Sequence, residues 1–154
     1  MLDELNHIVN VLAPAANVFA GAVPTKVINM KNWGCACFIV QCGVGAAGTA
    51  TITIEACSDA TPTLTTAIPF FYQECVTGDT YGPITQAPAT GFTTAAASNK
   101  VYKVFVLEQS LALTGYGYVR LKSTEVVVGA IAGGVVAVLS NGRFVNEVPA
   151  TVLV

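Results

Sequence analysis

The stretch ATITIEA, residues 50–56, carries the clearest structural signal in the chain, because apolar and polar side chains alternate along it. A period of two is typical of a β-strand with one face on a hydrophobic core. It predicts two sets of side chains: Ile52, Ile54 and Ala56 facing inward, and Thr51, Thr53 and Glu55 facing outward. Glu55 is therefore expected to be an ordinary outward residue of a strand.

Further segments of strand length lie on both sides of this stretch. They cover residues 25–30, 35–42, 68–76, 100–107, 117–123 and 135–139. Turn-forming residues separate them without interleaved helices, which favours antiparallel pairing. We therefore predict an all-β fold, an antiparallel β-sandwich of the jelly-roll type. Segment 77–99 is predicted to be a long loop with one short strand at Phe92, and a loop of this length is expected to be ordered by a neighbouring subunit.

The two ends of the chain show apolar patterns without an obvious partner. In residues 2–12, apolar residues recur at helical spacing and Pro14 follows, which predicts a short amphipathic helix or arm. The last residues, VPATVLV (148–154), predict an extended tail that needs a strand partner. We divide the chain into an arm and connector (1–24), a sandwich (25–143) and a tail (144–154). Nine residues are the candidate docking residues: Leu2, Leu5, Ile8, Val9, Leu12, Val148, Val152, Leu153 and Val154.

Charged residues make up 10% of the chain, against about 25% in an average soluble domain. The net charge of −2 and the scattered basic residues indicate that nucleic acid is not a partner. The late apolar run 126–139 is shorter than a membrane-spanning helix and is interrupted by glycines, and Asp3 and Glu4 stand where a secretory signal would be basic. We expect a soluble, unprocessed chain with no membrane partner, which packs against copies of itself.

Several residues belong to types that can support catalysis or metal binding. His7 is the sole histidine and falls in the predicted helix, where a solvated role is expected. The five cysteines are odd in number and lack zinc-site spacing, which indicates free, buried thiols. The motif GVGAAG (43–48) has the letters of a dinucleotide site, but a strand follows it, so we expect a hairpin turn. Glu74 is expected to pair with Arg120 across strands. We predict no enzymatic activity, no cofactor and no metal.

Four stretches together resemble small structural proteins of tailed-phage and prophage particles. They are VLAPAANVFAGAVPTKVINMKNWGCACFIVQCGVGAAGTATITIEACSD (11–59), AIPFFYQ (67–73), GYGYVRLKSTEVV (115–127) and AVLSNGRF (137–144). The resemblance implies a small β-rich protein present in many copies. Head decoration (cement) proteins are the most similar functional class; they bind assembled capsid shells, often as trimers, and reinforce them.

The expected partners are therefore other copies of the chain, with a trimer as the expected form, and the major capsid protein or another virion protein. The expected location is the capsid surface, after synthesis in the host cytoplasm. Two alternatives stay open. One is another virion part, such as a tail-tube, head–tail joining or spike-base protein. The other is a carbohydrate-binding adhesin module that uses Trp33 and the tyrosines.

Overall fold

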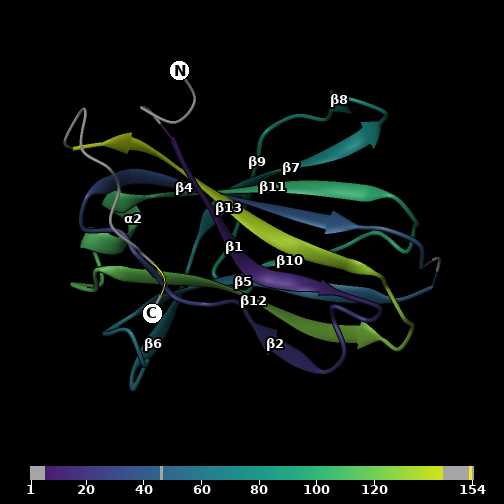
Figure 1. Cartoon of the computed structure of the whole chain (residues 1–154), viewed down its shortest axis with the longest axis horizontal. Coiled ribbons are helices and arrows are strands. Elements are labelled where there is room, and N and C mark those ends of the chain that lie inside the picture. Colours follow the sequence, from purple (N-terminus) through teal and green to yellow (C-terminus); the bar gives the residue numbers. More distant parts are fainter. Residues whose placement is uncertain (1–5, 46, 144–152, 154) are drawn as a thin grey trace.

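The computed structural model describes residues 6–45, 47–143 and 153, and it is built from two antiparallel β-sheets packed face to face (Figure 1). The predicted all-β sandwich is confirmed. Within the described residues, one short helix, α2 (Glu108–Ala112), interrupts the strands. No helix in this described part is long and apolar enough to cross a bilayer.

The first sheet has seven strands in the order β1-β13-β4-β11-β7-β8, and β9 also pairs with β7. Their bounds are β1 (Asn6–Ala15), β13 (Gly133–Gly142), β4 (Trp33–Cys42), β11 (Lys100–Leu107), β7 (Phe70–Thr77), β8 (Thr80–Tyr81) and β9 (Thr85–Ala87).

The second sheet has six strands in the order β10-β5-β12-β2, with β3 also on β12 and β6 on β5. Their bounds are β10 (Phe92–Thr93), β5 (Thr49–Cys57), β12 (Tyr118–Val127), β2 (Ala22–Pro24), β3 (Ile28–Asn29) and β6 (Thr65–Ile68).

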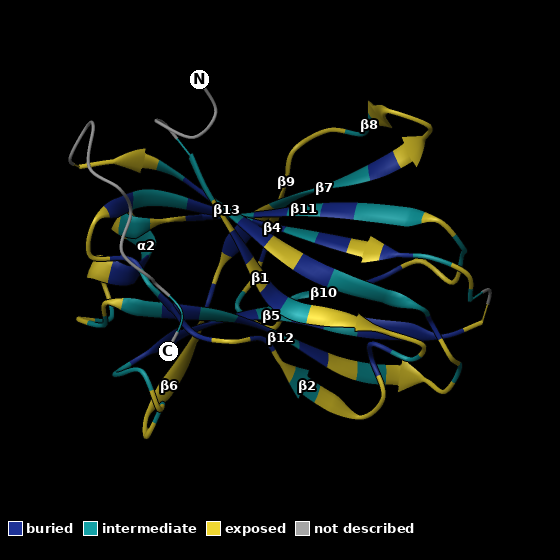
Figure 2. Cartoon of the chain, viewed as in Figure 1, coloured by how far each residue is buried: buried dark blue, intermediate teal, exposed yellow. Residues whose placement is uncertain are grey.

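The hydrophobic core lies between the two sheets (Figure 2). Ile52, Ile54 and Ala56 of β5 are fully buried, as the alternation in this strand predicts. Phe38 on the opposite sheet is also fully buried and lies in register with Val104 of β11 and Ala137 of β13. This core excludes water from one face of every long strand. A shift of one residue would turn the buried side chains to solvent, so burial fixes the register of each strand.

The predicted N-terminal helix is wrong for residues 6–12, which belong to strand β1. This strand pairs antiparallel with β13, from Asn6 opposite Ser140 to Ala15 opposite Gly133. Val9 and Val11 are buried on the inner side of β1. They lie two residues apart, as in a strand, although the apolar residues of this segment also fit helical spacing. Two bulges, before and after Leu12, shift the register and blur that period.

Segment 77–99 contains three short strands, which pair with other strands of the same subunit. After β8 the chain returns along β7 as β9 and then crosses to the second sheet, where β10 pairs with β5. The short strand expected at Phe92 is confirmed as β10. The segment thereby joins the two sheets at one edge of the sandwich.

The glycine-rich stretch 43–48 is a connection between sheets, not a hairpin turn. It follows β4 in the first sheet and precedes β5 in the second. A dinucleotide site needs a helix directly after its glycines. In the structure, strand β5 follows this stretch instead.

Candidate interaction surface

The outer face of the second sheet is polar. Thr51, Thr53 and Glu55 point outward from β5, and Arg120 and Lys122 point outward from β12 beside them. Glu55 is outward as predicted, but it is only 9% exposed, because both cations lie against its carboxylate. Arg120 Nη2 is 2.7 Å from Glu55 Oε2, and Lys122 Nζ is 3.3 Å from Glu55 Oε1.

The expected Glu74–Arg120 pair is wrong. Glu74 lies on β7 in the first sheet, whereas Arg120 lies on β12 in the second. Each residue has a partner in its own sheet: Glu74 pairs with Lys100 at 2.8 Å, and Arg120 pairs with Glu55. Sequence alternation predicts the direction of these side chains but not the sheet in which their strands pair.

The outer face of the first sheet is apolar. In β4, Ala36, Phe38 and Val40 are fully buried in the core, so the residues between them point away from the second sheet. The register places one row of outward residues across five strands: Ile8, Val138, Cys37, Phe105 and Phe71. The next row, from β1 to β7, is Asn10, Val136, Ile39, Lys103 and Gln73.

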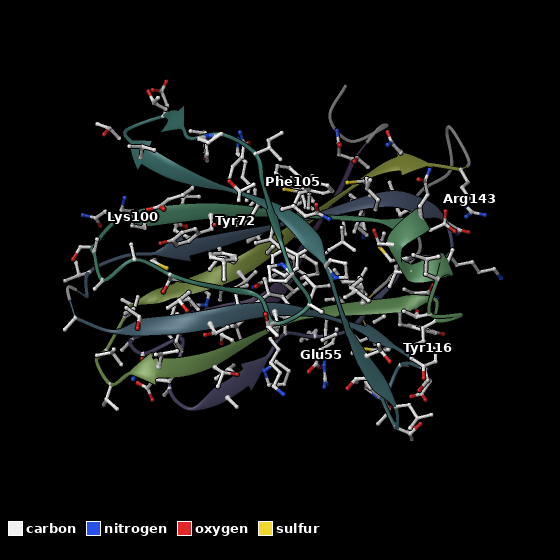
Figure 3. The ribbon with its side chains drawn as sticks, turned by 180° about the vertical axis from the view of Figure 1, so that it is seen from behind. Glu55, Tyr72, Lys100, Phe105, Tyr116 and Arg143 are labelled. Carbon is white, nitrogen blue, oxygen red and sulfur yellow. The ribbon has the colours of Figure 1, made fainter. Side chains whose placement is uncertain are left out.

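We call this surface the apolar face. It consists of Ile8, Cys35, Cys37, Ile39, Phe71, Phe105, Leu107, Val136 and Val138. Several of its side chains are well exposed, with Ile8 at 63% and Val136 at 37%. Figure 3 shows Phe105 and Glu55 on opposite outer sides of the two layers. The sandwich therefore has one charged outer face and one apolar outer face.

Lys103 is the one charged residue in these two rows of the apolar face. Its Nζ lies 3.5 Å from the centroid of the Tyr81 ring on β8, in a cation–π contact. The charge is thus held toward the β8 edge of the sheet. The part formed by β1, β13 and β4 presents only uncharged side chains in these rows.

The two cysteines on the apolar face are poor nucleophiles. Burial is the largest cause that raises the pKa of the Cys35 thiol, and it raises the pKa of Cys37 to about 11, with the neighbouring Cys35 adding to the shift. Both thiols are therefore protonated at neutral pH, whereas the thiolate is the reactive and metal-binding form. Among the described residues, no group of three or more His, Cys, Asp and Glu side chains is placed to hold a metal ion.

His7 has a packing role that differs from the solvated helical role expected for it. It lies on β1 and stacks on Trp33, with ring centroids 5.9 Å apart and planes 13° from parallel. Trp33 itself is buried. A buried indole does not offer its face to a sugar, so Trp33 does not support the carbohydrate-binding alternative, which also relied on the tyrosines.

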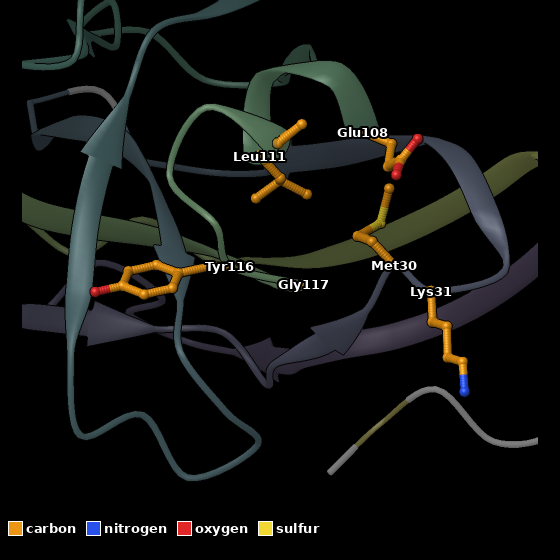
Figure 4. A pocket seen from close by; sticks show the side chains of 7 residues that line it. Met30, Lys31, Glu108, Leu111, Tyr116 and Gly117 are labelled. Carbon is orange, nitrogen blue, oxygen red and sulfur yellow. The ribbon is translucent and has the colours of Figure 1, made fainter.

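A small pocket lies beside α2 and is lined by Met30, Lys31, Glu108, Leu111 and Tyr116, among others (Figure 4). Its volume is about 70 Å³. Pockets that hold organic ligands enclose roughly 300–1,000 Å³. The carboxylate of Glu108 is also paired with Arg143, so the pocket offers neither the room nor a free acid for catalysis.

The structure scatters the predicted docking residues. Ile8 lies on the apolar face, Val9 is buried in the core, and Leu12 packs partly buried against it. Leu153 forms an antiparallel bridge with Ile28. The remaining predicted docking residues lie outside the described part of the chain: Leu2, Leu5, Val148, Val152 and Val154.

The apolar face itself was missed by sequence reasoning, although a signal for it exists. Residues 35–40 and 135–139 are nearly continuous apolar runs rather than alternating ones. Such runs are typical of strands that are covered on both faces.

Comparison with known proteins finds no match: no protein-family model, no curated protein and no solved structure is similar to this chain.

Proposed function

We propose that this chain is a non-enzymatic structural subunit of a phage particle, and most closely a decoration protein that binds and stabilises the head shell as a homo-oligomer. The observation that supports the proposal is the apolar face, whose central row from Ile8 to Phe71 carries no polar side chain apart from the Cys37 thiol. Monomeric soluble proteins rarely expose contiguous apolar patches larger than a few hundred Å². A subunit that works inside an assembly has such a face covered.

The chemistry of the described residues supports a role without catalysis. The sole histidine stacks on a buried tryptophan, the thiols on the apolar face are held protonated, and the best-enclosed carboxylate, Glu55, is paired with two cations. None of these groups is a nucleophile beside a free base, which is the arrangement that covalent catalysis needs. The surface, rather than a cleft, is the feature that distinguishes this molecule.

The experiment is to recover particles from the cells that encode this chain and measure its abundance by quantitative mass spectrometry. A decoration protein is expected at a copy number comparable with that of the major shell protein. An electron-microscopy map of the same particles locates the chain. Density on the head supports the proposal, density confined to the tail or the joining region supports the alternative virion part, and absence from the particles contradicts both.

A further inference from the structure

We infer that the apolar face packs against the same face of a second copy, sheet on sheet, about a two-fold axis. The inference rests on the proposed role as a structural subunit and names the surface and the partner for self-association. It concerns the purified chain, so it can be tested without any particle.

The charge distribution favours a second copy of the same face as the occupant. Against the polar outer face of another copy, the apolar face would desolvate Glu55, Arg120 and Lys122 without offering any acid or base as a partner. Against itself, it buries mainly apolar side chains, with Asn10 and Gln73 as the uncharged polar members of the second row. The one charge in its two central rows, Lys103, is held over Tyr81 near the β8 edge, away from β1, β13 and β4.

The size of the face is sufficient for a stable pair. Five neighbouring strands are separated by four spacings of about 4.8 Å and span roughly 19 Å, and strands of eight to ten residues are roughly 26–33 Å long. The footprint of the whole sheet face is therefore roughly 500–600 Å² per copy, or about 1,000–1,200 Å² for the pair, which reaches the lower end of specific interfaces. Two sheets that pack in this way align within about 30° of each other, with their side chains interdigitated.

The symmetry follows from the use of the same face by both copies. When both copies contribute the same patch, the contact is isologous and closes as a dimer. The trimer implied by the phage resemblance needs two unlike patches on each copy, so it would use surfaces other than the apolar face. We therefore expect pairing through this face whether or not other contacts assemble the pairs further.

The test uses a charge placed at an exposed position of the apolar face, Val136→Lys, with Thr53→Lys as its matched control. Both positions lie on outer strand faces, but Thr53 lies on the polar sheet. Sedimentation velocity over a concentration series is expected to show a dimer for the wild type and for Thr53→Lys. The Val136→Lys dimer is expected to dissociate at least about 100-fold more readily, because a lysine would be buried without a partner. Circular dichroism establishes that each variant is folded.

Alkylation of Cys37 gives a second readout that needs no substitution. This thiol lies in the central row of the apolar face, so it is covered in the pair and partly exposed in a monomer. Its raised pKa makes alkylation slow, so the rate is compared between protein concentrations at one pH. Dilution of the wild-type protein is expected to accelerate the alkylation of Cys37, while the buried Cys42 and Cys57 stay protected.

A wild type that remains monomeric at micromolar concentration, or a dimer that survives Val136→Lys, overturns the inference. A dimer that is absent from particles overturns only the proposed function, and a monomer found on shells overturns only the pairing.

Discussion

Glu55 is nearly buried on an outer face because Arg120 and Lys122 close over its carboxylate from the adjacent strand. Its inner neighbours Ile54 and Ala56 are fully buried, so the strand carries an ionic cluster on one side and the core on the other. The guanidinium of Arg120 donates from Nε and approaches the same carboxylate oxygen with Nη2, which fixes the geometry more firmly than a single contact would. This cluster is the most enclosed set of charges in the described structure, and its loss should be measurable.

We expect Glu55→Gln to lower the free energy of unfolding by about 1–2 kcal/mol, because Arg120 would keep its charge in a poorly hydrated position without a carboxylate. The matched variant is Glu74→Gln, whose pair with Lys100 is more exposed. It is expected to cost less than about 1 kcal/mol. Urea denaturation of both variants measures the difference, and equal losses would show that Glu55 is no better enclosed than Glu74.

A second residue-scale prediction concerns Gly91, which turns the chain between β9 and β10. Its φ is +83°, and a Cβ at this position would overlap the carbonyl oxygen of Ile52. We expect Gly91→Ala to cost about 3 kcal/mol, from the left-handed backbone together with the overlap. Gly78→Ala is the control, since Gly78 also has a positive φ but has open space around it. It is expected to cost about 1 kcal/mol. Thermal melts of the two variants that coincide would contradict the close approach of Gly91 to β5.

At the scale of elements, strand β1 shows where sequence reasoning succeeds and where it fails. The alternation in residues 50–56 is regular and predicts both the strand and its buried side correctly. In residues 6–12, Ile8, Val9 and Leu12 also fit a helix, and only the pairing with β13 decides between the two. The local pattern of apolar residues does not predict that long-range pairing, because the hydrogen bonds that stabilise β1 come from residues 133–140.

The apolar face was hidden from sequence reasoning for the same physical reason. Cys37 and Phe105 are ordinary members of two apolar runs, and their neighbourhood exists only once β4 and β11 lie side by side. The low charge content of the sequence leads to the expectation of covered surfaces. It could not predict which outer face is apolar, since that depends on the strand order of the sheet.

The status of β1 as an integral strand leads to a prediction at this scale. Val11 is fully enclosed, whereas its neighbour Asn10 points outward. We expect Val11→Ala to lower the free energy of unfolding by about 2 kcal/mol, and Asn10→Ala to change it by less than about 0.5 kcal/mol. Chemical denaturation at low protein concentration separates these effects from self-association. Similar small effects for both would indicate that β1 is a detachable arm.

At the scale of the whole molecule, one sheet presents a charged outer face and the other presents an apolar outer face. The core between them also encloses ionisable groups that have no ionic partner. Burial raises the pKa of the Cys42 thiol to about 11 and that of the Tyr102 hydroxyl to about 12. The Tyr102 oxygen also accepts a hydrogen bond from the backbone N–H of Ala95, which partly offsets the effect of burial on its pKa.

These shifts predict that stability falls at alkaline pH. In the unfolded chain a cysteine ionises near pH 8.5 and a tyrosine near pH 10. The folded state binds these protons more tightly than the unfolded state, so the stabilisation is complete below about pH 8.5 and is lost as pH rises through about 11 to 12. Urea denaturation at a series of pH values from neutral to about 11 measures this loss.

The Cys42→Ala variant isolates the contribution of one group. A small cavity lowers the stability of this variant at neutral pH, but its stability should fall less steeply between about pH 9 and 11 than that of the wild type. Lysine and surface tyrosine titrations are common to both proteins, so equal slopes for the two would show that the Cys42 thiol ionises as freely in the folded protein as in water.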